Sequence, residues 1–405
     1  MRRSIRRWVG VIVAIGVAVP LAAVAGAPAG AQAKADPIVI GVYTPADNPT
    51  FTAPELIPAA EAAAKYVNKE RAGINGAPIK IISCTTDYTP DSLTRCANEL
   101  FQQKPDIIMP GPDASAFTVF NVFADAGFPL IGGASFTPPE YTSDLRALFN
   151  GFSASLFPGM VYFSAKELGA TKKLVVVSFD DGINPALVKV FMDPTAQALG
   201  LGEVQFIPTQ PGTADFAAPL AAAVSAEPDA ILAFGVPCAP LVQAYASLGT
   251  DIPLVQPSNC NDTANLKASG AAAEGTYYVN QFLAPSMNPK NADVKLFQTI
   301  LKKYGKGKIP ITDFSSAGVA SILNIEAALD TTDIATATPE SLLAVFKGAV
   351  AQKNFLAEPY TCSPAPVAKW PGICSGSVYL DQVKKGKLRR LTPFVPIEDL
   401  YAAAG

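Results

Sequence analysis

Histidine is missing from this sequence of 405 residues. Its absence excludes mechanisms that use an imidazole as a base, a proton shuttle or a zinc ligand, and with them the serine–histidine and cysteine–histidine hydrolases. An excess of positive charge is missing too, because 31 Lys and Arg residues stand against 34 Asp and Glu residues. A nucleic acid partner requires a basic stripe, so we expect none.

What is present is a globular composition. Hydrophobic residues make up 49% of the chain and charged residues 16%, which excludes a disordered or fibrous protein. The length predicts about two or three domains. No GxxxxGK[ST] or GxGxxG motif opens a helix, and no nucleophile–base pair or carboxylate dyad stands out. We therefore expect no catalytic residue, no enzymatic activity and no cofactor.

The N-terminus has the pattern of a targeting segment. Four arginines within residues 2–7 precede an apolar run from Trp8 to Ala25, and small residues follow up to Ala33. This pattern predicts a signal peptide over residues 1–33, cleaved near Ala33. The alternative is an uncleaved membrane anchor, which Pro20 and the small-residue tail disfavour. No cysteine precedes Cys84, so a lipid anchor is excluded, and we expect an exported protein in the periplasm, the cell envelope or the extracellular space.

The six cysteines favour disulfide bonds, because an exported chain with an even number of cysteines is typically oxidised. Six cysteines allow 15 connectivities, and short sequence separations favour one of them. The alternative, a metal or redox site, lacks both histidine and a CxxC motif, so we expect no metal. The predicted pairs are Cys84–Cys96, Cys238–Cys260 and Cys362–Cys374.

Short apolar runs alternate with helical patterns along the chain, which is typical of βαβ units and parallel sheets. The expected strands are Ile38–Val42, Ile79–Ser83, Ile107–Pro110, Pro129–Gly132, Leu174–Phe179, Glu203–Ile207, Ala230–Gly235, Ile252–Gln256, Thr276–Gln281, 376–384 and 388–394. The expected helices are 53–69, 90–103, 115–126, 156–168, 184–199, 213–226, 239–248, 291–304, 314–330 and 338–350. Residues 133–153 carry no clear strand. So many strands fit two α/β lobes better than one sheet.

Three loops at the expected carboxyl ends of strands hold small, polar and hydroxylated residues. They cover Thr44–Thr50, residues 111–115 and residues 132–137. Ligands of open α/β sheets bind at this edge, and N–H and O–H groups at helix starts suit an anion. Ordinary capping and turn formation is the competing explanation for each loop.

The order of these segments resembles the type I periplasmic binding proteins of ABC importers, the leucine/isoleucine/valine-binding group. The resemblance runs from about Ile38 to the C-terminus, and no single motif in it is highly specific. The stretches that carry it are IVIGVYTP, AAAKYVNKERAGINGAPIKII, PDIIMPGPDASAFTV, GFPLIGGASFTPPE, TADFAAPL and AAAEGTYYV. It implies two Rossmann-like lobes joined by a hinge of three crossovers, with the ligand cleft between them. We place lobe one at residues 34–150 and 283–357, and lobe two at residues 151–282 and 358–405.

The resemblance also implies a set of ligand-binding residues. In lobe one, Ser115 and the backbone around Ala114 match the family's grip on an amino-acid carboxylate, and Ser115→Ala would then weaken binding about 10- to 100-fold. Ala134 and Ser135 match the second carboxylate-binding loop, and Phe51 falls where the family places an aromatic ring. In lobe two, the residues in loops that face the cleft are Asn184, Cys238 and Ser258.

Two departures leave the ligand open. The family's acidic partner of the ligand ammonium is replaced by Ser258, and a tyrosine near position 238 is replaced by Cys238. A buried ammonium without a partner is costly. The Asp residues that could substitute are Asp113, Asp180, Asp181 and Asp262. A zwitterionic amino acid and a carboxylate or amide without an ammonium both remain candidates.

The predicted function is solute capture for an ABC importer. The ligand is a small polar or carboxylate-bearing molecule, a branched-chain amino acid or a related compound, and lobe closure delivers it to the permease and ATPase subunits. We expect a monomer that is peripheral to the membrane through the permease. The alternative is a ligand-sensing or regulatory domain of the same fold.

Overall fold

The computed structural model describes residues 36–48, 50–330, 332 and 337–402. The predicted signal peptide lies outside the described residues. Two β-sheets flanked by helices make up the fold, which confirms the predicted α/β class with two Rossmann-like halves. Within the described ranges, none of the helices combines the length and the apolar content of a membrane span.

The first sheet is parallel and has the strand order β2-β1-β3-β4-β5. Its strands are β1 (Ile38–Pro45), β2 (Ile79–Thr86), β3 (Ile107–Met109), β4 (Leu130–Ile131) and β5 (Arg146–Ala147). The connecting helices are α1 (Leu56–Glu70), α2 (Pro90–Phe101), α3 (Ala116–Val119), α4 (Asn121–Ala126) and α5 (Pro138–Thr142). β1 is apolar nearly throughout because helices cover both faces of the sheet.

The second sheet has the order β12-β11-β10-β9-β8-β6-β7. β11 is antiparallel to both of its neighbours, β10 and β12, and the other pairs are parallel. Its strands are β6 (Leu174–Phe179), β7 (Gln205–Thr209), β8 (Ala230–Ala233), β9 (Leu254–Pro257), β10 (Tyr277–Asn280), β11 (Tyr379–Lys384) and β12 (Lys387–Arg390). Its helices are α6 (Ser153–Lys166), α7 (Asn184–Leu187), α8 (Asp193–Ala198), α9 (Ala217–Ser225), α10 (Cys238–Ser247), α11 (Thr263–Ser269) and α15 (Ile397–Ala402). Short irregular helices cover Val188–Met192, Ser258–Cys260 and Gly270–Ala273.

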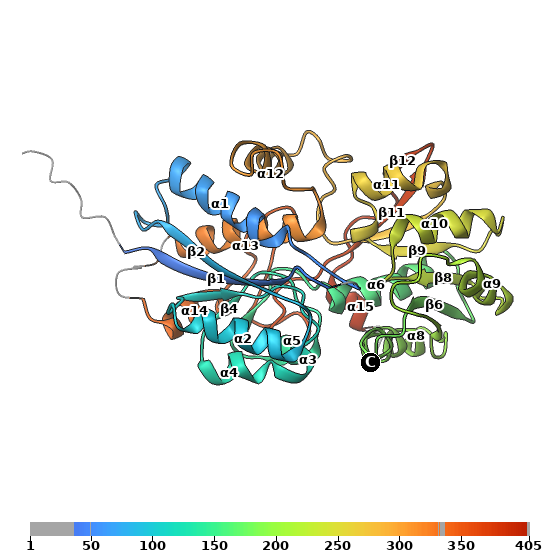
Figure 1. The fold of residues 1–405 in the computed structure, drawn as a ribbon, viewed down its shortest axis with the longest axis horizontal. Coiled ribbons are helices and arrows are strands. Elements are labelled where there is room, and N and C mark those ends of the chain that lie inside the picture. Colours follow the sequence, from blue (N-terminus) through green and yellow to red (C-terminus); the bar gives the residue numbers. More distant parts are fainter. Residues whose placement is uncertain (1–35, 49, 331, 333–336, 403–405) are drawn as a thin grey trace, which may run out of the picture. The chain divides into compact units, whose positions relative to one another are not determined.

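Helices from distant parts of the sequence share the faces of the first sheet. The return segment forms α12 (Ala292–Lys303), α13 (Asp313–Leu329) and α14 (Pro339–Lys347). α13 packs beside α1 on one face, and α2 and α4 cover the other face (Figure 1). Residues after β10 therefore return to the first sheet, and the start of α13 lies beside the loops that follow its strands.

The chain passes between the two sheets three times. The passages lie between Ala147 and Ser153, between Asn280 and Ala292, and between Lys347 and Tyr379. The boundaries proposed at residues 150, 282 and 357 fall inside these three intervals. Phe152 adopts a left-handed backbone with φ of 39° in the first passage, and its N–H donates to Gln281 Oε1 in the second over 3.0 Å.

Several elements differ from the expected ones. Residues 133–153 contain α5 and the two-residue strand β5, which the sequence pattern did not reveal. The expected helix 115–126 is divided at Phe120 into α3 and α4. The expected helix 184–199 contains a π-helical turn over Val188–Met192. Pro194 has no N–H to donate to Val190, so the turn widens and Asp193 donates to Val188 instead.

Candidate functional site

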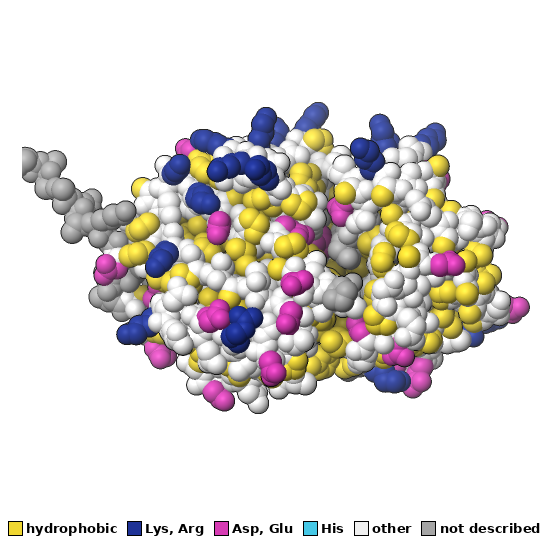
Figure 2. Space-filling model, viewed as in Figure 1, with side chains coloured by type: hydrophobic (Ala, Val, Ile, Leu, Met, Phe, Trp, Pro, Cys, Tyr) yellow, Lys and Arg dark blue, Asp and Glu magenta, His cyan; other side chains and the backbone are white. Residues whose placement is uncertain are grey.

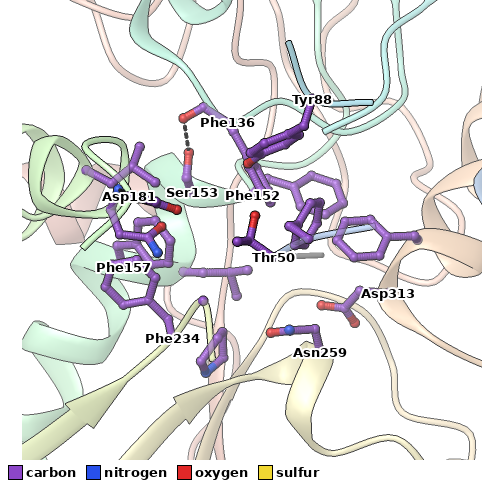
Figure 3. Close-up of a pocket in the computed structure, with 17 residues that line it drawn as sticks. Thr50, Tyr88, Phe136, Phe152, Ser153, Phe157, Asp181, Phe234, Asn259 and Asp313 are labelled. Carbon is purple, nitrogen blue, oxygen red and sulfur yellow. Dashed lines mark hydrogen bonds between the residues drawn. The ribbon is translucent and has the colours of Figure 1, made fainter. Parts of the chain in front are cut away.

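A pocket of about 70 Å³ lies where loops from both sheets meet (Figure 3). The first sheet contributes the loops after β1, β2 and β4, and the second sheet contributes the loops after β6, β8 and β9. The first residues of α6 and α13 complete the wall. Loops at the carboxyl ends of parallel strands form the binding sites of open α/β sheets, so this pocket is the candidate ligand site.

Seven aromatic side chains dominate the wall of the pocket. They are Phe51, Tyr88, Phe136, Phe152, Phe157, Phe234 and Phe314. Phe51 is at the centre of one group, with ring centroids 5.7 Å from Tyr88, 5.2 Å from Phe136 and 5.6 Å from Phe314. Phe157 and Phe234 form a second group with centroids 4.3 Å apart. Rings on both sides make the wall of the pocket largely apolar.

The polar groups of the wall are few. They are Thr50, Ser153, Asp181, Asn184, Asn259 and Asp313. The Asp181 and Asp313 side chains lie on opposite sides of the pocket, with their carboxylates directed toward its centre (Figure 3). Asp181 Oδ1 accepts hydrogen bonds from the N–H groups of Ile183 at 3.0 Å and Asn184 at 2.8 Å, which fixes the carboxylate at the start of α7.

Asp313 joins elements of the two sheets. It is the first residue of α13, and its carboxylate accepts a hydrogen bond from the hydroxyl of Ser258, which follows β9 of the second sheet. Burial raises the pKa of Asp313 from 3.8 to about 6, and the Ser258 hydroxyl partly opposes this rise. The carboxylates of Asp262 and Glu55 contribute to the same rise. Asp313 also borders a second, more polar cavity on the other side of Ser258.

Two of the residues predicted for the site line the pocket. Phe51 comes from the loop after β1, and Asn184 begins α7. Asn184 is 8% exposed, and its side-chain amide makes no hydrogen bond with another described residue. That amide is therefore available to a ligand.

Ala114 and Ser115 lie behind the pocket wall and are buried. The N–H of Ser115 donates to Asp113 Oδ1 over 2.9 Å, and its hydroxyl lies beside the same carboxylate without forming a hydrogen bond to a described residue. The amide of Ala114 faces the hydroxyl of Tyr88. Burial raises the pKa of Asp113, and the hydroxyls of Thr86 and Ser115 lower it.

Ala134 and Ser135 belong to the core rather than to the pocket wall. The guanidinium of Arg146 donates from Nη2 to Ser135 Oγ over 2.7 Å, and the Tyr141 hydroxyl donates to the Ser135 carbonyl. Arg146 is completely buried beside Glu140, and this burial lowers the pKa of Arg146 to about 10.

Cys238 and Ser258 flank the pocket without lining it. Cys238 begins α10 and is bonded to Cys260 in the turn that contains Ser258. The other disulfides join Cys84 to Cys96 and Cys362 to Cys374, so the structure has the pairing that the spacing predicted. Ser258 instead lines the second cavity and donates to Asp313.

The sequence interpretation did not include most of the pocket. Asp313, Asn259, Tyr88 and the remaining phenylalanines were not among the predicted residues. One signal could have found several of them: a phenylalanine next to a strand end or a helix start, as at Phe136 and Phe234, occupies a position where turn residues are usual. Asp313 carries no comparable signal. In the described part of the chain, no group of three or more acidic, cysteine or histidine side chains is arranged to hold a metal ion.

A two-sheet α/β fold with a pocket at facing strand ends defines a class of ligand-capturing proteins. A family model described as periplasmic binding protein matches residues 37–361. The chain therefore belongs to the periplasmic binding protein family, which confirms the resemblance seen in the sequence. Members of this family bind small molecules and work with ABC transporter permease and ATPase components.

Solved structures share the fold at low sequence identity. A branched chain amino acid ABC transporter from Thermus thermophilus with bound valine has a TM-score of 0.76 at 15% identity, covering 91% of this chain and 98% of that one. A solute binding protein from R. palustris in complex with benzoate has a TM-score of 0.67 at 19% identity, with coverages of 89% and 97%. A fatty acid ABC transporter substrate-binding protein from Thermomonospora curvata has a TM-score of 0.70 at 19% identity, with coverages of 89% and 92%. A sequence search among curated proteins found no match.

Proposed function

We propose that this protein is the extracytoplasmic solute-binding protein of an ABC importer and that its ligand is a small molecule with an apolar or aromatic body. The observation that carries the proposal is the pocket between the strand ends of the two sheets, with seven aromatic rings and six polar residues in its wall. Such a wall suits the side chain of a branched-chain amino acid or a related compound. The similar proteins are described with valine, with benzoate or as a fatty acid transporter, and those compounds share an apolar body.

The remaining parts of the proposal concern export and closure. Residues 1–33 direct export and are cleaved near Ala33, and the mature protein acts as a monomer. Lobe one (34–150 and 283–357) and lobe two (151–282 and 358–405) close on the ligand, and the permease recognises the closed form. No catalytic step is part of this function.

Native mass spectrometry of the secreted protein tests the proposal. We expect a polypeptide that begins after Ala33 and carries one small molecule. Phe51→Ala should weaken the binding of that molecule about tenfold or more, because burial of a phenylalanine contributes about 1.5–3 kcal/mol. Phe128→Ala is the matched control, since Phe128 is a partly buried ring stacked on Phe101 and away from the pocket. A protein that carries no small molecule and responds to no compound of a broad solute library would contradict the proposal.

A further inference from the structure

We propose that the ligand is a cation, an amine or ammonium with an apolar or aromatic body, which Asp181 and Asp313 neutralise from opposite sides of the pocket. This inference rests on the proposed function and specifies the ligand class of the same pocket. It differs from the small polar or carboxylate-bearing ligand that we predicted from the sequence. Three features support it: the sign of the charges in the pocket wall, the hydrogen bonds already made by the two loops behind that wall, and the aromatic character of the wall.

The first feature is the sign of the charge. Two carboxylates face the pocket, and neither Lys nor Arg is among the described residues that line it. Figure 2 shows Lys and Arg side chains gathered instead along the edge that carries α12, α11 and β12. Basic residues at that edge include Lys267, Lys387 and Arg389, which line a separate surface groove. Both carboxylates accept hydrogen bonds, but no Lys or Arg of the pocket wall pairs with them. An anionic ligand would therefore meet two negative charges in a partly dehydrated site, whereas a cation would pair with them.

The second feature is that the backbone N–H donors of the loop at residues 111–115, which the family resemblance assigns to a ligand carboxylate, already have partners within the protein. A ligand carboxylate needs free N–H groups at the start of α3, yet the N–H of Ser115 donates to Asp113 and the amide of Ala114 faces Tyr88. Asp113 itself is fully buried and has no Lys or Arg partner among the described residues. A carboxylate placed here would lie beside this buried carboxylate.

The polar groups of Ser135, in the loop at residues 132–137, also have partners within the protein. The Ser135 hydroxyl accepts from Arg146, and the Ser135 carbonyl accepts from Tyr141. Arg146 is the cation that contacts this loop, but the nearby carboxylate of Glu140 opposes its charge, and its guanidinium also donates to the Leu130 carbonyl over 2.9 Å. Arg146 lies outside the pocket wall. Neither loop therefore offers a free cation to an anionic ligand.

The third feature is the aromatic wall. A cation over the face of an aromatic ring gains about 0.5–2 kcal/mol, most where water is excluded. The rings of Phe51, Tyr88 and Phe136 lie on the same side of the pocket as the loops of the first sheet. The side-chain carbonyls of Asn184 and Asn259 add acceptors for ammonium hydrogens. Carboxylates, rings and amide oxygens together match an ammonium attached to an apolar body.

Calorimetric titration with matched probes tests this inference at pH 7.5. One set is phenethylamine, 2-phenylethanol and 3-phenylpropionate. A second set is 3-methylbutylamine, 3-methylbutanol and 4-methylpentanoate. Within each set only the terminal group changes, from ammonium to hydroxyl to carboxylate. We expect the amine of at least one set to bind about tenfold or more tightly than its alcohol, and the carboxylate to bind least. Asp181→Asn and Asp313→Asn should each weaken amine binding about tenfold and change alcohol binding less than twofold.

Asp180→Asn is the control, because Asp180 is an exposed neighbour of Asp181 that does not line the pocket. Equal or tighter binding of the alcohol or carboxylate in both sets overturns the cation proposal, as does unchanged amine affinity in both pocket variants. Failure of all six probes together with a neutral or anionic co-purified solute overturns the cation proposal alone. Failure of all six probes with no bound solute and no response to the broad solute library overturns the proposed function as well.

Discussion

Asp313 begins α13 with a partly buried carboxylate that accepts a hydrogen bond from Ser258 of the second sheet. The start of a helix favours a negative charge, but removal of the carboxylate from water opposes it more strongly. The result is a group whose pKa is about 6 in the folded protein and 3.8 when solvated. Such a group costs folding free energy when it is ionised, and a bound cation would offset that cost. Functional sites often contain groups of this kind.

The pKa of Asp313 predicts how Asp313→Asn changes stability with pH. Near pH 3 the Asp313 carboxyl is protonated in both the folded and the unfolded protein. Between its unfolded pKa of 3.8 and its folded pKa of about 6, only the unfolded chain ionises. The free energy of unfolding of the natural protein therefore falls across this pH window. The asparagine variant lacks this loss and should gain about 1–3 kcal/mol relative to the natural protein between pH 4 and pH 7. Urea unfolding of both proteins across this range measures it. A difference independent of pH would show that Asp313 ionises normally.

The structure changes the effect on ligand affinity that we expect from Ser115→Ala. Its hydroxyl caps no helix and lies behind the pocket wall beside Asp113. Ser115→Ala should therefore change the affinity for a bound amine less than twofold and the free energy of unfolding by about 1 kcal/mol or less. Calorimetry and thermal unfolding on the same variant measure both quantities. A tenfold loss of affinity at unchanged stability would restore the serine as a ligand donor and count against a cationic ligand.

The sequence could predict site residues that are placed by a nearby strand, but not those that are placed by packing between distant segments. Phe51 lies in the loop after β1, and Asn184 begins the helix that follows β6, so the carboxyl ends of those strands bring both residues to the pocket. Asp313 follows no strand. It reaches the pocket because α13 packs beside α1, an arrangement between segments far apart in the sequence. Local sequence pattern carries no information about such packing, and the family resemblance did not include this position.

At the scale of elements, long apolar strands were predictable and short ones were not. β1 and β6 are apolar runs with buried side chains on both faces, and both were expected from the sequence. β5 has two residues, one of them Arg146, whose burial depends on Glu140 and Ser135. Two residues cannot show a periodicity, and an arginine is atypical of a core strand. Its recognition required the tertiary structure.

The turn after β4 makes a prediction about element packing. Gly133 has φ of +76°, and a Cβ atom there would overlap the Pro110 carbonyl oxygen at the end of β3. Gly133→Ala should therefore cost more than about 2 kcal/mol of stability, from both the backbone conformation and the displacement of β3. Gly127→Ala is the control: Gly127 has φ of +73° and open space around its Cβ position, so it should cost only about 1 kcal/mol. Equal losses in the two variants would contradict the close approach.

At the scale of the whole molecule, the arrangement in two sheets followed from the number of expected strands and from the family resemblance. The segment that contains α12 to α14 returns to the first sheet, and the start of α13 adds Asp313 and Phe314 to the pocket wall. The hydrogen bond from Ser258 to Asp313 spans the two sets of elements at the edge of this pocket. Closure on a ligand would place such contacts across the gap, and opening would break them.

Small-angle X-ray scattering with and without ligand tests the central claim, capture of a solute between two lobes, most directly. The ligand is the co-purified solute or the tightest probe, at a concentration that calorimetry shows to be saturating. We predict a smaller radius of gyration for the bound protein, and no change when the same compound is added to Phe51→Ala under conditions where that variant is unsaturated. An unchanged radius of gyration in the saturated natural protein would contradict capture by lobe closure.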